Sequence, residues 1–141
     1  KIPPFLASAV LNVIISQRLV RKIHNNCVES FTPESDMLAQ IKREMKLAGL
    51  DEKDARVPSI YYRGHGCTAC NYTGYLGRVG VFEVMRITEA VRKLMVSTEF
   101  NLDALRKIAR EEGMTTMFED GLRKVERGIT TLEEVFRVIR E

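Results

Sequence analysis

Two pairs of potential metal ligands constrain the fold of this chain more than any other feature of its sequence. His24 and Cys27 form an H-x-x-C pair, and after 39 intervening residues Cys67 and Cys70 form a C-x-x-C pair. Side chains three positions apart in a tight turn can both point at one ion, and two such turns complete the tetrahedron that zinc prefers. The spacing therefore predicts a zinc site with His24, Cys27, Cys67 and Cys70 as ligands, which would tie a loop to a distant β unit.

The predicted zinc is structural, because four protein ligands leave no open position for a substrate or an activated water. A C-x-x-C pair also occurs in redox proteins, but no thioredoxin-like βαβ pattern surrounds these cysteines. A site that has lost its metal is a further alternative. His65, two residues before Cys67, is a rival fourth ligand, or else a surface histidine in a glycine-rich loop.

The composition describes a folded chain without a strong charge bias. Its 141 residues suffice for one ordinary domain or two small ones, and its net charge is only +3 with the signs interspersed. This balance disfavours nucleic acid or a membrane surface as the main partner. The most apolar stretch, residues 2–15, is too short to span a bilayer and lacks the features of a signal peptide. Together with the odd number of cysteines, three, these features predict a cytoplasmic location.

The periodicity of apolar residues predicts a mainly α chain with a small antiparallel β unit. Residues 5–23 show a wide helical pattern and predict a buried helix, whereas 24–31 is expected to be a loop. Thr32 and Pro33 have the residue types of a helix start, and Gly49 is placed to end that helix.

Two strands are expected around the cysteines, and helices after them. Val, Ile, Phe and Tyr favour strands at about 60–62 and 78–87, on either side of the glycine-rich C-x-x-C turn. From Thr88 onward a compact bundle of three or four helices is predicted. The residues that mark its helix starts and stops are Thr88, Asn101, Gly113, Gly128 and Thr131, with Thr131 and Glu134 at the spacing of a capping box.

The segment Gln17–Arg21 (Gln-Arg-Leu-Val-Arg) combines two cations and an amide at the end of the first predicted helix. Such a group could serve a phosphate or a neighbouring subunit. More often it is a solvated helix terminus that the helix dipole favours.

A set of short motifs covers nearly the whole chain. In chain order they are Gln17-Arg18-Leu19-Val20-Arg21 with the x-x-Cys element that follows, Gly66-Cys67-x-x-Cys70, Thr73-Gly74-Tyr75-x-Gly77-Arg78, Phe82-Glu83, Gly113-Met114-Thr115-Thr116, Asp120-Gly121-Leu122, and Gly128-x-Thr130-Thr131-x-Glu133-Glu134-Val135. This set resembles the ATPases of type II secretion and type IV pilus assembly.

The resemblance implies a chain that follows the nucleotide-binding half of a RecA-like P-loop ATPase domain. Residues 1–23 would be a helix from the end of the nucleotide-binding core, 24–87 a zinc-binding subdomain, and 88–141 a C-terminal helical subdomain. Cys27 and the C-x-x-C pair match the family's zinc ligands. The family commonly has two C-x-x-C pairs, and His24 stands here where the first cysteine would be.

The resemblance also implies the working context. Full-length members form hexamers at the cytoplasmic face of the inner membrane, where they use ATP and Mg to drive pseudopilus or pilus assembly and protein export. The expected partners are neighbouring ATPase subunits and an inner-membrane platform protein, and nucleic acid is not expected.

No G-x-x-x-x-G-K-[ST] phosphate loop occurs in the sequence, so this chain is not expected to be an enzyme by itself. The predicted function is a structural and assembly module of a secretion-system ATPase. The alternative is a stand-alone zinc-ribbon module that binds nucleic acid or a regulatory partner. The alternative predicts binding to DNA that weakens steeply as salt rises.

Overall fold

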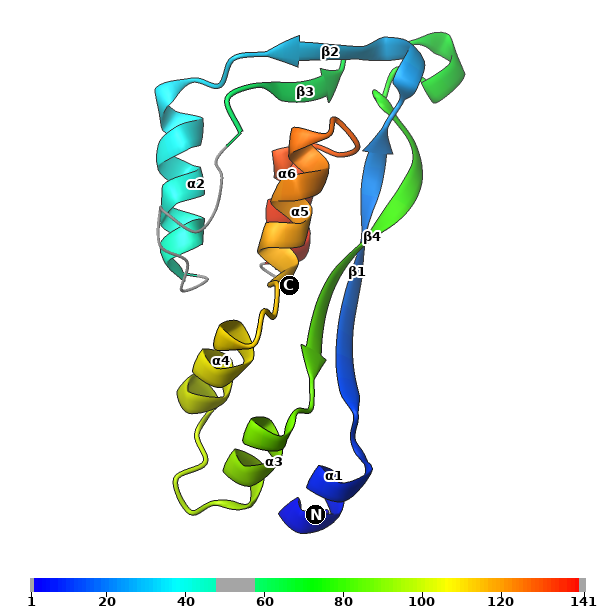
Figure 1. Cartoon of the computed structure of the whole chain (residues 1–141). Helices are drawn as coiled ribbons and strands as arrows, with labels where there is room; N and C mark the ends of the chain where they lie inside the picture. Colours follow the sequence, from blue (N-terminus) through cyan, green and yellow to red (C-terminus); the bar gives the residue numbers. More distant parts are fainter. Residues whose placement is uncertain (1, 48–57, 140–141) are drawn as a thin grey trace. The chain divides into compact units, whose positions relative to one another are not determined.

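A computed structural model describes residues 2–47 and 58–139 of the chain. Within these residues the protein is helix-rich, and its strands form two small sheets, β1 with β4 and β2 with β3 (Figure 1). The chain divides into two compact units. Unit 1 comprises Lys1–Ser16 and Glu83–Thr115, and unit 2 comprises Gln17–Phe82 and Thr116–Glu141.

Unit 1 contains three short helices and the ends of two long strands. The helices are α1 (Pro4–Val10), α3 (Glu89–Val96) and α4 (Leu102–Glu111), and the strands are β1 (Val13–Ile23) and β4 (Tyr75–Arg86). α1 packs against α3, and α3 packs against α4. Thr88 and Asn101 cap α3 and α4, because their side-chain oxygens accept the backbone N–H groups of Val91 and Ala104 at 3.3 and 2.8 Å. These two caps confirm the helix starts that the sequence predicts.

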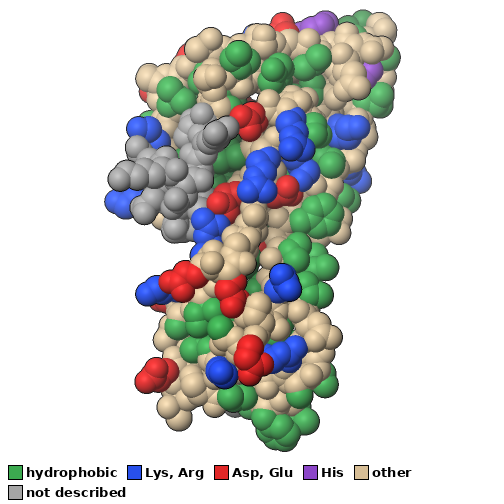
Figure 2. Space-filling view, viewed as in Figure 1, with side chains coloured by type: hydrophobic (Ala, Val, Ile, Leu, Met, Phe, Trp, Pro, Cys, Tyr) green, Lys and Arg blue, Asp and Glu red, His purple; other side chains and the backbone are tan. Residues whose placement is uncertain are grey.

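Few side chains of unit 1 are deeply buried. Its buried apolar residues are Ile87, Val91 and Ala109. Several large apolar side chains are exposed instead, and Figure 2 shows hydrophobic surface around α1. The exposed fractions are largest for Ile2 at 78%, Val10 at 71%, and Phe5 and Leu102 at 63% each. Unit 1 therefore has a thin core and an unusually apolar surface.

Unit 2 is built around a larger core. Its short strands β2 (Val28–Phe31) and β3 (Tyr61–Gly64) pair antiparallel, with Val28 opposite Gly64 and Phe31 opposite Tyr61. Three helices accompany them: α2 (Ser35–Leu47), α5 (Met117–Glu126) and α6 (Leu132–Ile139). The core residues are Ile41, Met45, Tyr61, Phe118, Leu122, Val125, Leu132, Val135 and Phe136. A second, smaller cluster joins β1 and β4 to α6 through Val20, Val81 and Val138.

The two long strands run antiparallel. The N–H of Ile87 donates to the carbonyl of Asn12 at 2.9 Å, and the N–H of His24 donates to the carbonyl of Gly74 at 2.9 Å. Residues near the start of β1 therefore lie opposite residues near the end of β4, as an antiparallel pair requires. The small antiparallel β component that the sequence predicts is present.

The predicted buried helix over residues 5–23 is wrong. The first helix ends at Val10, and an 11-residue strand occupies Val13–Ile23. The physical reason lies in the run Val13-Ile14-Ile15, whose β-branched side chains lose rotamer freedom in a helix and fit a pleated surface. A wide apolar pattern does not by itself distinguish a helix from a strand, and most of β1 is exposed rather than buried.

Other boundaries also differ from the sequence prediction. The segment 24–31, predicted as a loop, contains β2. Helix α2 begins at Ser35 rather than at Pro33, and its predicted end at Gly49 lies outside the described residues. The four helices after residue 88 do not share one bundle, because α3 and α4 belong to unit 1 and α5 and α6 to unit 2. The functional division into 1–23, 24–87 and 88–141 stays a prediction.

None of the described helices combines the length and the apolar character that a membrane crossing requires.

Candidate metal centre

Two tight turns present the four predicted ligands. His24 directly follows β1, and Cys27 ends the one-turn 3-10 helix Asn25–Cys27. Cys67 precedes a second one-turn 3-10 helix, Thr68–Cys70, which Cys70 ends. The structure brings all four side chains together in unit 2, with their ligand atoms within 4.8 Å of one another. We call these four residues the metal cluster.

Four of the six separations within the metal cluster are close to those of a tetrahedral zinc site. Zn–S bonds of about 2.3 Å and Zn–N bonds of about 2.0 Å at tetrahedral angles require about 3.8 Å between sulfurs and about 3.5 Å between sulfur and nitrogen. The sulfur of Cys70 lies 3.9 Å from that of Cys27 and 3.7 Å from that of Cys67. Nδ1 of His24 lies 3.5 Å from the sulfur of Cys27 and 3.2 Å from that of Cys67. The donor set therefore fits a zinc ion, with Nδ1 as the histidine donor.

Backbone N–H groups point at the sulfur of Cys70. The N–H groups of Cys67 and Gly74 donate to this sulfur at 3.2 and 3.3 Å. Burial favours the neutral thiol and raises its pKa, but these backbone hydrogen bonds, together with those to the side chains of Cys67 and Cys27, outweigh burial and lower the pKa of Cys70 to about 6. The turn thus favours a thiolate, which is the form that binds metal.

Cys27 is more deeply buried, with 1% of its surface exposed. Burial raises the pKa of the Cys27 thiol, and the backbone N–H of Gly66 partly offsets this effect. A buried thiol with a raised pKa binds metal with release of its proton, so metal affinity at this centre should rise with pH.

Glycines allow the second turn to close. The backbones of Gly64 and Gly74 approach so closely that a Cβ on Gly74 would lie 2.4 Å from the carbonyl oxygen of Gly64. Gly74 also has a φ of +77°, and Asn71 and Tyr72 before it are left-handed as well, at +51° and +57°. Sequence reasoning marked this segment as glycine-rich but did not identify Gly74 as a backbone donor to Cys70. The short spacing between the two residues was the available signal.

The rival ligand lies apart from the sulfurs. His65 is exposed and is not a member of the metal cluster, although its backbone N–H donates to the carbonyl of Cys27 at 2.9 Å. The geometry therefore favours His24 as the nitrogen donor. A redox role for the C-x-x-C pair alone would not require His24 and Cys27 to converge on it.

Residues 2–137 match the family described as Type II/IV secretion system protein. The type II secretion system ATPase E of Vibrio cholerae is 39% identical over 99% of this chain and 25% of its own length. The type IV pilus assembly ATPase PilB of Thermus thermophilus is 37% identical over 95% of this chain and 14% of its own length.

A third relative, the protein transport protein HofB homolog of Escherichia coli, is 33% identical over 96% of this chain and 26% of its own length. The chain thus spans about a quarter or less of the curated relatives named here, while nearly all of it is matched. The chain therefore belongs to the Type II/IV secretion system protein family.

Proposed function

We propose that this chain is a zinc-stabilised structural and assembly module of a hexameric ATPase that powers type II secretion or type IV pilus assembly. The observation that carries the proposal is the convergence of four metal-ligand atoms within 4.8 Å of one another, in a chain of this family. When bound, zinc would supply a closed four-coordinate cross-link between the two turns. Folding energy, not chemistry, is its contribution.

The module does not hydrolyse ATP by itself. Its sequence lacks the phosphate loop whose backbone and lysine hold nucleotide phosphates. ATP and Mg belong to the full-length parent, in which this chain would follow the nucleotide-binding core. Purified chain should release no phosphate from ATP above a blank reaction. Phosphate release that follows the chain through purification would contradict this part of the proposal.

Unit 1 supports the assembly part of the proposal. Large exposed apolar side chains on a folded surface mark contacts with other protein, and unit 1 exposes Phe5, Val10 and Leu102 by more than half. We propose that this surface packs against the motor core or a neighbouring subunit. The full-length parent would lie at the cytoplasmic face of the inner membrane, where the platform protein would be a further partner.

Elemental analysis tests the zinc proposal directly. Purified chain should contain one zinc per molecule, and His24→Ala should lower this content clearly because it removes one of four ligands. His65→Ala is the matched control, since this histidine is exposed and lies outside the metal cluster. Zinc that is lost from His65→Ala but kept by His24→Ala would contradict the ligand set.

A gel shift separates the proposal from the zinc-ribbon alternative. An assembly module should not shift duplex or single-stranded DNA at low salt, whereas a nucleic-acid-binding module should shift it and lose affinity as salt increases. Salt-sensitive binding at micromolar chain would favour the alternative.

A further inference from the structure

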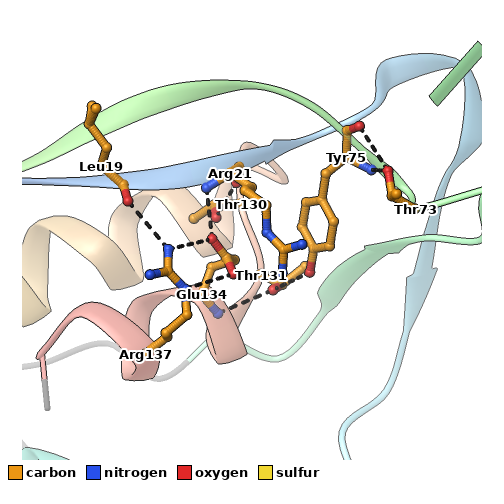
Figure 3. Close-up of polar contacts among 8 residues, drawn as sticks. All are labelled: Leu19, Arg21, Thr73, Tyr75, Thr130, Thr131, Glu134 and Arg137. Carbon is orange, nitrogen blue, oxygen red and sulfur yellow. Dashed lines mark hydrogen bonds and ion pairs between the residues drawn. The ribbon is translucent and has the colours of Figure 1, made fainter. Parts of the chain in front are cut away.

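A buried carboxylate at the start of α6 is the centre of a second polar group in unit 2. Glu134 is only 2% exposed, and its two oxygens accept hydrogen bonds from two arginines (Figure 3). Arg21 of β1 donates its backbone N–H and its Nη2, each at 2.8 Å. Arg137 donates Nε at 3.2 Å and Nη2 at 3.0 Å. A buried carboxylate is stable only with such compensation.

The end of β1 is held by Glu134 of α6 and by the connection between α5 and α6. The backbone N–H of Arg21 donates to Glu134, and its carbonyl accepts the hydroxyl of Thr130 at 2.7 Å. Two residues later, the N–H of Ile23 donates to the carbonyl of Ile129 at 2.9 Å. Both sides of the Arg21 backbone are thus bonded to residues more than a hundred positions away.

The start of β4 is fixed to the same place. The ring of Tyr75 lies 4.2 Å below the guanidinium carbon of Arg21, and its hydroxyl lies 2.9 Å from Oγ1 of Thr131 (Figure 3). Thr73 connects Tyr75 to the C-x-x-C turn. Its Oγ1 accepts the N–H of Tyr75 at 3.2 Å, and its hydroxyl donates to the carbonyl of Cys70 at 2.6 Å. We call the six residues Arg21, Tyr75, Thr130, Thr131, Glu134 and Arg137 the Glu134 clamp.

The Glu134 clamp lies a few residues along the chain from the metal cluster on both sides. Arg21 precedes His24 by three residues, and Tyr75 follows Cys70 by five. The N–H of His24 also donates to the carbonyl of Gly74, the residue before Tyr75. Metal–ligand distances tolerate errors of only about 0.2 Å. A small movement of either strand end at the clamp would therefore misplace a ligand.

We propose that Glu134 is a positioning residue for the metal cluster. By holding Arg21 and, through it, Tyr75, this carboxylate sets the two turns at the separation that one zinc ion needs. Zinc binding and the docking of α6 onto β1 are then coupled, and each strengthens the other by the same factor. This inference rests on the proposed zinc site and adds to it a residue that is not a ligand.

The zinc affinity of Glu134→Gln tests the inference. The substitution keeps the shape of the side chain but removes the charge that binds both guanidinium groups. Competition with a chromophoric zinc chelator at pH 7.5 should give a dissociation constant about tenfold higher than that of the unaltered chain, the lower end of the effect of losing a supporting hydrogen bond at a metal site. Equal affinities in the two proteins would overturn the inference and leave the proposed zinc site intact. Failure of the unaltered chain to bind zinc would overturn both.

Two controls separate positioning from general destabilisation. Glu133→Gln removes the neighbouring exposed carboxylate of the same helix, and Val135→Ala weakens the core cluster beside Glu134, which contains no residue of β1. Both should keep the zinc affinity within twofold, measured where each zinc-free variant is folded. A loss in Val135→Ala as large as that in Glu134→Gln would show that the effect is only structural, and would overturn the inference.

A second variant and a reciprocal measurement keep the test decisive if Glu134→Gln does not fold. Tyr75→Phe removes only the hydroxyl bond to Thr131, keeps the ring below Arg21, and should raise the dissociation constant about twofold to threefold. In the unaltered chain, removal of zinc should speed hydrogen exchange at the N–H groups of Arg21 and Ile23 at least tenfold. Unchanged affinity in Tyr75→Phe together with unchanged exchange at these two groups would overturn the inference.

Discussion

The two units of this chain are stabilised in opposite ways. Unit 2 contains a nine-residue apolar core, the metal cluster in two tight turns, and the Glu134 clamp between β1, β4 and the start of α6. In unit 1 the buried apolar residues are Ile87, Val91 and Ala109, and side chains such as Phe5 and Val10 face outward. Unit 2 has the features of a unit that can fold by itself, whereas the exposed apolar side chains of unit 1 are typical of a surface that another protein covers.

This contrast indicates a division of work within one short chain. A unit with its own core can keep its shape by itself, and the proposed zinc would cross-link it further. A unit with a thin core can gain stability when another protein covers its apolar surface. A partner that binds the folded form but not the unfolded form shifts the folding equilibrium toward the folded form. Substitutions in unit 2 should therefore change the stability of the isolated chain far more than similar substitutions in unit 1.

Loss of the metal should have the largest effect. Cys27→Ala should abolish stoichiometric zinc binding and lower the free energy of unfolding of unit 2 by more than about 4 kcal/mol at zinc concentrations a thousandfold above the dissociation constant. Urea unfolding with and without chelator measures this difference, and the zinc-free unaltered chain should unfold like the variant. Hydrogen exchange within α3 and α4 of unit 1 should change little. Equal unfolding midpoints with and without zinc would contradict the account.

A pair of phenylalanines compares the cores of the two units. Phe118 is buried in the core of unit 2 and stacks on Phe136 with 6.2 Å between ring centroids, so Phe118→Ala should cost about 3–4 kcal/mol. Phe100 in unit 1 is 46% exposed, and Phe100→Ala should cost less than about 1 kcal/mol. Urea unfolding followed by circular dichroism measures both. Similar costs at the two positions would remove the contrast between the units.

Two glycines of unit 2 test whether the stability cost of a substitution depends on close backbone contact rather than on lying in unit 2. Gly74 and Gly77 both have positive φ, at +77° and +75°, but only Gly74 meets another backbone, that of Gly64. Gly77→Ala should lower the free energy of unfolding by about 1 kcal/mol, because alanine is strained in the left-handed region. Gly74→Ala should lower it by at least about 2 kcal/mol more, because its Cβ would also meet the backbone of Gly64. Thermal unfolding of zinc-loaded protein can compare them. A Gly74→Ala variant as stable as Gly77→Ala would show that the backbones of Gly64 and Gly74 can move apart without loss of stability.

A further prediction concerns the pH dependence of unit 2. Burial opposes ionisation of Glu134, but hydrogen bonds from Arg137 and Arg21 outweigh it and lower the pKa to about 2, from an ordinary value of 4.5. Below pH 4.5 the unfolded chain takes up this proton first, so the stabilisation is present above pH 4.5 and is lost as pH falls toward 2. Because both arginines are about half exposed, solvent screening should limit the loss to about 1–2 kcal/mol.

Urea unfolding of zinc-free protein between pH 2.5 and 5.5 measures this loss without a contribution from zinc release. Glu134→Gln should show a flatter dependence over that range. An unchanged slope would indicate that Glu134 is not held by the arginines in solution.

The metal cluster could be predicted from the sequence because the spacing of its ligands within each pair is a local signal. Each H-x-x-C or C-x-x-C pair specifies one turn, and the preference of zinc for four ligands supplies the long-range pairing. The caps at Thr88 and Asn101 were predictable for the same reason, since a cap depends on residues three positions apart.

The features that the sequence did not predict depend on distant partners. Residues of β1 were predicted to be helical because their apolar side chains recur on more than one face. Pairing with β4 and the contact of Val20 with α6 add to the strand preference of the β-branched run. Glu134 had the spacing of a capping box, and its N–H does lie 3.4 Å from Oγ1 of Thr131. Its carboxylate instead binds Arg21, which is 113 residues away. No local pattern distinguishes these two uses of a glutamate at that position.

X-ray absorption at the zinc edge tests the metal cluster most directly. The purified, zinc-loaded chain should show three sulfur neighbours at about 2.3 Å and one nitrogen neighbour at about 2.0 Å. His24→Ala, loaded with excess zinc, should keep the three sulfurs but lose the outer-shell scattering of the imidazole ring, because a water can take the vacated position at a similar distance. A spectrum with mainly oxygen or nitrogen neighbours, or one that His24→Ala leaves unchanged, would contradict a site built from His24, Cys27, Cys67 and Cys70.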